Sequence, residues 1–200
     1  MDPRVERGMR RQLAAAPSDR IGWKIALNAP AIMEGLGIEE PALGWLAQDR
    51  VAEGTHSLAG ATAAAVEPEI VIEAGEGATV ARVGAALEVV DFDRGLDDLE
   101  AVLAHNVFHR AVAVGELAEG SPGEAVFAVN GEERARVTEF EPPARTLAFV
   151  DDFLRRVGTE LAPGDLVIAG ALSAPVPVAP DDAAELTVDG LGSIHLEFSP

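Results

Sequence analysis

The sequence predicts an α+β fold, built around one mixed, mostly β sheet that is rolled or closed into a barrel and flanked by a few helices. Short apolar runs rich in β-branched residues dominate the chain, and two of them cover residues 66–73 and 85–91. Asn130-Gly131, between two further strand-like runs, supplies the positive φ angles of a tight hairpin turn. One longer stretch, residues 145–157, has the apolar spacing of an amphipathic helix. Many strands with few intervening helices favour a mixed rolled sheet over a doubly wound fold.

The remaining elements follow from shorter patterns. We expect helices over residues 4–16, 31–36 and 96–104, and strands over residues 22–27, 108–114, 166–172, 176–178 and 194–198. From Glu39 to Gly60 no period holds, and proline and glycine interrupt the chain, so the sequence predicts a long loop there. Arginines give the first helix the character of a solvated segment. We therefore divide the chain into a short N-terminal helical lead-in, residues 1–20, and one main domain, residues 21–200.

Composition excludes several classes of function. The chain has 200 residues and a net charge of -19, so nucleic acid or an anionic membrane surface is not expected as a partner. No apolar run is long enough to cross a bilayer, and the N-terminus lacks the apolar core of a signal peptide, which predicts a cytoplasmic protein. The absence of cysteine excludes disulfides, zinc-thiolate sites and thiol nucleophiles.

Acidic residues inside two predicted strands are the strongest functional signal. Glu67 and Glu69 are two residues apart in a strand, so both carboxylates project from the same face. Glu88 is the only charge within the apolar run before Asp91, and a buried carboxylate needs a partner. Three oxygen donors without cysteine indicate a hard cation, Mg2+ or Mn2+. The alternative is that Glu67 and Glu69 lie on a solvated strand face and that Glu88 pairs with an arginine.

Other candidate residues carry weaker signals. Lys24 is the single lysine of the chain, although a composition rich in arginine explains the scarcity of lysine without any function. His105 and His109 are four residues apart, a spacing that metal sites use on helices, but Asn106 makes a continuous helix doubtful and a structural role is the alternative. No glycine-rich phosphate loop and no nucleophile elbow is present.

Taken together and in order, the motifs resemble the fumarylacetoacetate hydrolase superfamily, most closely its 2-oxo-4-pentenoate hydratase and 4-oxalocrotonate decarboxylase branch. The resemblance covers about residues 20–198. The blocks that carry it are Gly22-Trp23-Lys24-Ile25, Leu36-Gly37-Ile38-Glu39-Glu40-Pro41 with Gly44 and Leu46, Val66-Glu67-Pro68-Glu69-Ile70, Ala86-Leu87-Glu88-Val89-Val90-Asp91, Gly190-Leu191-Gly192-Ser193-Ile194 and, in support, residues 161–170. The expected fold is therefore the rolled sheet of the fumarylacetoacetase C-terminal-like type.

The resemblance implies a function and a set of site residues. Glu67, Glu69 and Glu88 would hold Mg2+ or Mn2+, and Lys24 and Asp49 would be catalytic, with the lysine orienting an enolate or moving a proton. The implied activity is a metal-dependent lyase, a hydratase of a small 2-hydroxy-dienoic or 2-oxo acid. Decarboxylation, hydrolytic carbon-carbon cleavage of the acylpyruvate type, and metal or 2-oxo-acid binding without turnover are the alternatives. The resemblance also implies a homo-oligomer, a dimer or larger.

Departures from the family pattern concern the substrate more than the metal. Where the family has Gly-Leu-Thr-Ser, this chain has Ala26-Leu27-Asn28-Ala29, so Asn28 replaces a hydroxyl. The family's Ala-Asp-Asn-Ala-Ser block is here residues 104–108, with His105 at the acidic position, and its Thr-Gly-Ser is residues 169–171, leaving Ser173 as the nearest hydroxyl. Asn28, His105 and Ser173 are therefore the candidate substrate-binding residues.

Overall fold

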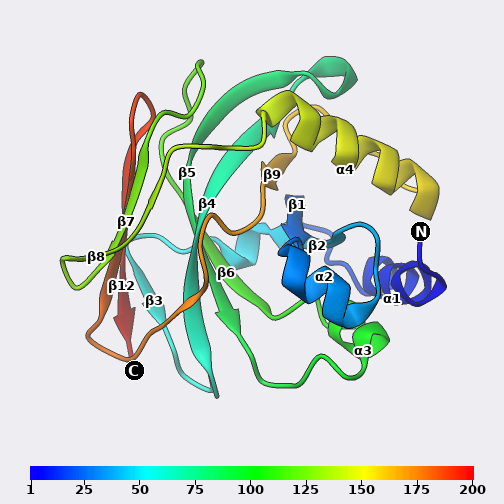
Figure 1. Ribbon diagram of the computed structural model, residues 1–200, viewed down its shortest axis with the longest axis horizontal. Helices are drawn as coiled ribbons and strands as arrows, with labels where there is room; N and C mark the ends of the chain where they lie inside the picture. The colour runs from blue at the N-terminus through cyan, green and yellow to red at the C-terminus, as the bar shows by residue number, and fades with distance from the viewer.

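The computed structural model describes residues 1–200 and contains two sheets with helices gathered on one side (Figure 1). The helices are α1 (Pro3–Ala14), α2 (Pro30–Leu36), α3 (Leu99–Ala104) and α4 (Pro143–Val157), with the short 3-10 turns η1 (Gln48–Arg50) and η2 (Glu76–Ala78). The strands are β1 (Arg20–Ala26), β2 (Ala42–Ala47), β3 (Thr55–Ser57), β4 (Ala64–Ala74), β5 (Val80–Asp91), β6 (His109–Val114), β7 (Ala125–Val129), β8 (Glu132–Val137), β9 (Leu166–Ile168), β10 (Val176–Pro177), β11 (Ala183–Val188) and β12 (Gly192–Ser199).

The larger sheet has the strand order β2-β1-β9-β4-β5-β6, with β10 added to β4. It is mixed, because β1 pairs parallel with β9 while its other pairings are antiparallel. The sheet rolls so that its two ends approach each other, since Val51, just beyond β2, bridges Val112 of β6. The smaller sheet, in the order β3-β12-β11-β7-β8, lies against β5 on the side away from the helices (Figure 1). The predicted mixed, mostly β rolled sheet is confirmed.

Each face of the larger sheet carries its own apolar cluster. Alternation along β4 sends Val66, Ile70 and Ile72 into the main core of 40 buried residues, which also contains most of the largest buried side chains. The opposite face carries a separate cluster of five, made of Leu46, Val71, Ala86, Val112 and Ile168. Glu67 and Glu69 share the face of Val71, so the sheet brings them beside this small cluster.

Helix α1 belongs to the main core. It buries Val5 and Met9 and packs against α3, and the buried amide of Gln12 donates hydrogen bonds to the carbonyls of Leu43 and Leu103. The solvated helix expected from its arginines is therefore wrong, because the arginines occupy only its outer face. None of the helices is long and apolar enough to cross a membrane.

The long loop predicted from Glu39 to Gly60 is also wrong. All six residues of β2 are buried, so this strand has no alternation to reveal it, and η1 and β3 follow it. Strand β11 lacks any counterpart among the predicted elements although it alternates buried and exposed residues, and β9 ends at Ile168, earlier than expected. The hairpin turn at Asn130-Gly131 is as predicted, with φ angles of 55° and 76°.

Candidate metal centre and its cavity

The pairing of β4 with β5 builds a cluster of three carboxylates. In this register Glu67 lies opposite Glu88, and Glu69 lies opposite Ala86, next to Glu88 on the same face. One oxygen of each carboxylate lies within 4.8 Å of the others. Glu69 and Glu88 are fully buried and Glu67 is half-buried. The carboxylate cluster, Glu67, Glu69 and Glu88, is therefore withdrawn from bulk water.

Burial and mutual repulsion raise the pKa values of two of these groups. Burial first, and then the charge of Glu88, raise the pKa of Glu67 to about 7. Burial, followed by the charges of Glu88 and Glu67, raises the pKa of Glu69 well above its ordinary value. Without a cation the cluster therefore holds protons at a pH where free glutamates have lost them.

Glu88 differs from the other two carboxylates because it has cationic and hydrogen-bonding partners. The ammonium of Lys24 bonds one oxygen of Glu88, Oε1, and donates a second hydrogen bond to the carbonyl of Val107, at 3.0 Å. His109 Nδ1 donates to the same oxygen, at 2.8 Å. Burial alone would raise the pKa of Glu88, but the charge of Lys24 and the bond from His109 outweigh it, so that pKa is lowered. Burial lowers the pKa of His109, which favours the neutral form of its ring.

The donor set of the cluster fits a hard divalent cation. The second oxygen of Glu88, Oε2, is buried and has no hydrogen-bond partner in the protein, which is costly unless a cation or proton meets it. Glu69 Oε2 accepts a 2.6 Å hydrogen bond from the backbone N–H of Gly170, which fixes the orientation of that carboxylate. Oxygen donors held close together in this way are typical of Mg2+ and Mn2+ sites.

A cavity of about 810 Å³ opens in front of the cluster. Lys24, Glu67 and Glu88 form its polar inner end, and most other lining residues are apolar. Asn28 and Ser173 also border this cavity, so two of the predicted substrate-binding residues lie in it. The positive φ angle of Gly170, 96°, suits glycine, and a side chain there would collide with the Asn28 amide.

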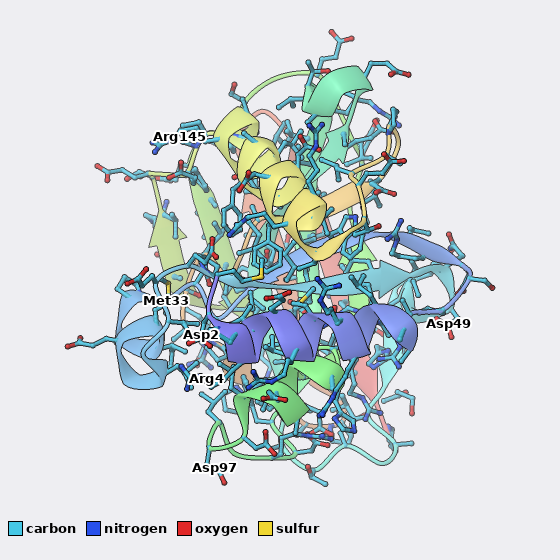
Figure 2. The ribbon with its side chains drawn as sticks, turned by 90° about the vertical axis from the view of Figure 1, so that its right-hand side faces the viewer. Asp2, Arg4, Met33, Asp49, Asp97 and Arg145 are labelled. Atoms are coloured by element: carbon cyan, nitrogen blue, oxygen red, sulfur yellow. The ribbon has the colours of Figure 1, made fainter.

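Two predicted site residues do not reach the cavity. Asp49 is exposed on η1, five residues beyond Gly44, the partner of Lys24 in β2, so the strand carries it roughly 15 Å away. In Figure 2, Asp49 and Met33 of the cavity-side helix α2 lie at opposite edges of the molecule. His105 is exposed at the end of α3, where its Nδ1 bonds the carbonyl of Ala101. The turn after α3 directs His109, and not His105, toward Glu88.

Residues 106–108, here called the left-handed segment, support the site through an unusual backbone. Asn106, Val107 and Phe108 all have positive φ, at 61°, 48° and 64°. Such angles cost roughly 1–3 kcal/mol each for residues other than glycine and persist only where other contacts enforce them. The Asn106 side chain provides those contacts by pairing with both the N–H and the carbonyl of Trp45. This segment presents the Val107 carbonyl to Lys24 and the Phe108 ring to the cavity, roles that no sequence pattern indicated.

Comparisons with known proteins find similarity to named enzymes at low identity. No protein-family model matches it. It is 28% identical over 209 positions to a 2-keto-4-pentenoate hydratase of Burkholderia vietnamiensis, covering 90% of this chain and 78% of that protein. It is 27% identical over 226 positions to a 4-oxalocrotonate decarboxylase of Pseudomonas sp. strain CF600, covering 97% and 83%.

Solved structures agree with the sequence comparisons. A 4-oxalocrotonate decarboxylase from Pseudomonas putida G7, complexed with calcium and acetate, superposes with a TM-score of 0.79 at 26% identity, covering 94% of this chain and 81% of that one. A fumarylpyruvate hydrolase from Pseudomonas aeruginosa, in complex with Mn2+ and pyruvate, shares the fold with a TM-score of 0.71 at 20% identity, covering 92% and 90%. The resemblance expected from the motifs is confirmed at low identity: the chain is similar to a 2-keto-4-pentenoate hydratase and to 4-oxalocrotonate decarboxylases.

Proposed function

We propose that the chain is a Mg2+- or Mn2+-dependent hydratase, a lyase that acts on a small 2-hydroxy-dienoic or 2-oxo acid. The observation that carries this proposal is the buried carboxylate cluster, which faces a cavity beside the only lysine of the chain. The hydratase and decarboxylase relatives support the reaction class, and Mg2+ and Mn2+ in solved relatives support the metal. Decarboxylation of a 2-oxo diacid and hydrolytic carbon-carbon cleavage are the alternatives.

Each residue of the inner end has a role in this proposal. Glu67, Glu69 and Glu88 would hold the cation, which when bound supplies positive charge to the carboxylate and 2-oxygen of the acid. Lys24, fixed by Glu88 and Val107, holds a proton at Nζ beside the reacting acid and can give or take it. Asn28 and Ser173 offer an amide and a hydroxyl to the substrate's polar end. Asp49 and His105 have no part in it, because both lie outside the cavity.

Metal binding is the first prediction. Glu67→Gln and Glu69→Gln should each weaken Mn2+ affinity at least about tenfold, because each removes a formal charge from a site made only of oxygens. Glu73→Gln is the matched control, since Glu73 is on the same strand and face but pairs with Arg82 at the surface. Titration calorimetry measures all three. Equal affinities in the two cluster variants and the wild type would contradict the assignment.

The second prediction concerns the pH dependence of the metal-free protein. A carboxyl whose folded pKa is raised stabilises the fold below its ordinary pKa of 4.5 and loses that contribution as pH rises through the folded value. Glu67 faces Glu69, Glu88 and Lys24 and loses its proton in this range. The melting temperature of the metal-free protein should therefore decrease between pH 6.5 and 8. His109, whose pKa is lowered from 6.5, opposes this decrease in the lower part of the window, whereas Glu88 acts only below it.

Thermal denaturation with EDTA checks this prediction. The decrease between pH 6.5 and 8 should become smaller in Glu67→Gln, and millimolar Mn2+ should abolish it in the wild type by binding the folded state. An unchanged melting temperature across the window, with and without Mn2+, would instead indicate carboxylates that are solvated and do not repel one another.

The third prediction concerns Lys24. Lys24→Met should keep Mn2+ and oxalate affinity within about tenfold while lowering kcat at least about a hundredfold, the range expected for a proton-transfer group. Lys24→Arg should not restore turnover, because a guanidinium stays protonated at neutral pH. The substrates to screen are 2-hydroxy-dienoates, 4-oxalocrotonate and acylpyruvates, followed by loss of enol absorbance.

Two outcomes of this screen would be decisive. If the wild type turns over no substrate while oxalate still binds, the chain is a non-catalytic binding protein. If Lys24→Met is as fast as the wild type, the role given to Lys24 is wrong. Circular dichroism of each variant checks that the buried substitution leaves the fold intact.

The fourth prediction is assembly into at least a dimer, which rests on the family resemblance. Light scattering should give a mass of at least twice 20.8 kDa across a wide concentration range. A constant monomer mass would refute it.

A further inference from the structure

The cavity is much larger than its polar end requires. Its volume of about 810 Å³ falls in the range of roughly 300–1,000 Å³ that is typical of sites for drug-sized ligands. A two- or three-carbon acid would occupy only the inner end, beside the buried carboxylates. The outer part of the cavity is therefore available to the rest of the ligand.

The outer part is apolar and partly exposed. Among large apolar side chains, Ile32 of α2 and Phe92 after β5 are exposed at 37% and 39%, and both border the cavity. The Phe92 ring meets the Phe108 ring edge-on, with centroids 5.1 Å apart and planes at 61°, so the two form one wall. Exposed apolar groups gathered at a cavity mouth mark a binding surface.

The backbone supports this wall at some energetic cost. Phe108 is in the left-handed segment, and Leu27, another lining residue, has a positive φ of 58°. Backbone strain in non-glycine residues is retained where a site must be shaped. The apolar wall is therefore a formed part of the cavity.

The cavity offers no free cation to a second carboxylate. Lys24 is engaged by Glu88 and Val107. Arg94, the other basic lining residue, makes two hydrogen bonds to the carboxylate of Asp93, at 2.8 and 2.6 Å. A second ligand carboxylate at Arg94 would have to displace Asp93 and would remain beside its negative charge. This arrangement disfavours diacids.

We propose that the cavity selects a 2-oxo monocarboxylate with an uncharged, apolar tail, whose polar head lies at the carboxylate cluster and whose tail packs on Phe92 and Phe108. This inference rests on the proposed function and narrows its substrate class. It separates this chain from the decarboxylation of a 2-oxo diacid, for which the outer part of the cavity lacks a counter-charge.

Calorimetry on the Mn2+-loaded protein tests the inference with oxalate, 2-oxobutanoate, 2-oxohexanoate and its diacid counterpart 2-oxohexanedioate. Two added methylenes should strengthen binding about tenfold from the four-carbon to the six-carbon monoacid. The diacid should bind at least about tenfold more weakly than 2-oxohexanoate. Oxalate binding with equal or tighter binding of the diacid would overturn the tail inference alone. Failure to bind Mn2+ and oxalate would overturn the proposed function as well.

Two variants locate the tail. Phe92→Ala should weaken 2-oxohexanoate about fivefold or more and leave oxalate within twofold. Phe149→Ala on α4 is the control, because it removes a half-buried aromatic ring outside the cavity and should change neither ligand. Arg94→Gln should leave both six-carbon acids within threefold of the wild type. A loss of tenfold or more confined to the diacid would identify Arg94 as a carboxylate receptor and overturn the proposal.

Discussion

Lys24 and Glu88 form an ion pair that is buried inside the large sheet, and the neighbouring residues are arranged around it. Removing two charges from water costs several kcal/mol per ion unless further hydrogen bonds compensate. Here the Val107 carbonyl accepts a hydrogen bond from the Lys24 ammonium, and His109 donates one to Glu88 Oε1. The second oxygen of Glu88 remains for the cluster, and this division of one carboxylate between a structural pair and a candidate cation site organises the centre.

The backbone around the pair is shaped to admit the lysine. Gly44 lies opposite Lys24 in the β1–β2 pairing, and a side chain at Gly44 would come within 2.7 Å of both Lys24 and the Asn106 amide. Asn106 in turn holds the left-handed segment against Trp45. A glycine of β2 and a strained turn that contains Asn106, two separate parts of the chain, therefore cooperate to place one ammonium group.

Charge and apolar surface are divided along the same cavity. The small apolar cluster behind the carboxylates, which includes Val71 and Ala86, shields the inner end from water and raises the electrostatic cost of leaving the cluster without a cation. At the outer end, Phe92 and Phe108 replace the polar groups that a second acid would need. The chain is strongly acidic, with a net charge of -19, so a cation at the cluster also reduces the repulsion that an anionic ligand meets.

Much of this protein could be predicted from local sequence. Apolar runs rich in β-branched residues predicted both central strands, over 66–73 and 85–91, Asn130-Gly131 predicted the hairpin, and the apolar spacing of 145–157 predicted α4. The spacing of Glu67 and Glu69 required only the two-residue period of a strand, and the isolated charge of Glu88 indicated a partner. These features are local, so neighbouring residues were enough to reveal them.

Other features depended on strand register and on strain, which no local pattern encodes. The sequence could not tell that Glu88 lies opposite Glu67, that its cationic partner is Lys24 instead of an arginine, or that His109 joins it while His105 stays in solvent. Strand β2 was hidden because burial on both faces erases alternation, and its register carries Asp49 away from the cavity. The sequence by itself determined which residues could bind a cation, and the tertiary structure decided which of them meet. The reason is that only the long-range pairing of strands in the larger sheet brings side chains from β1, β4, β5 and β6 together.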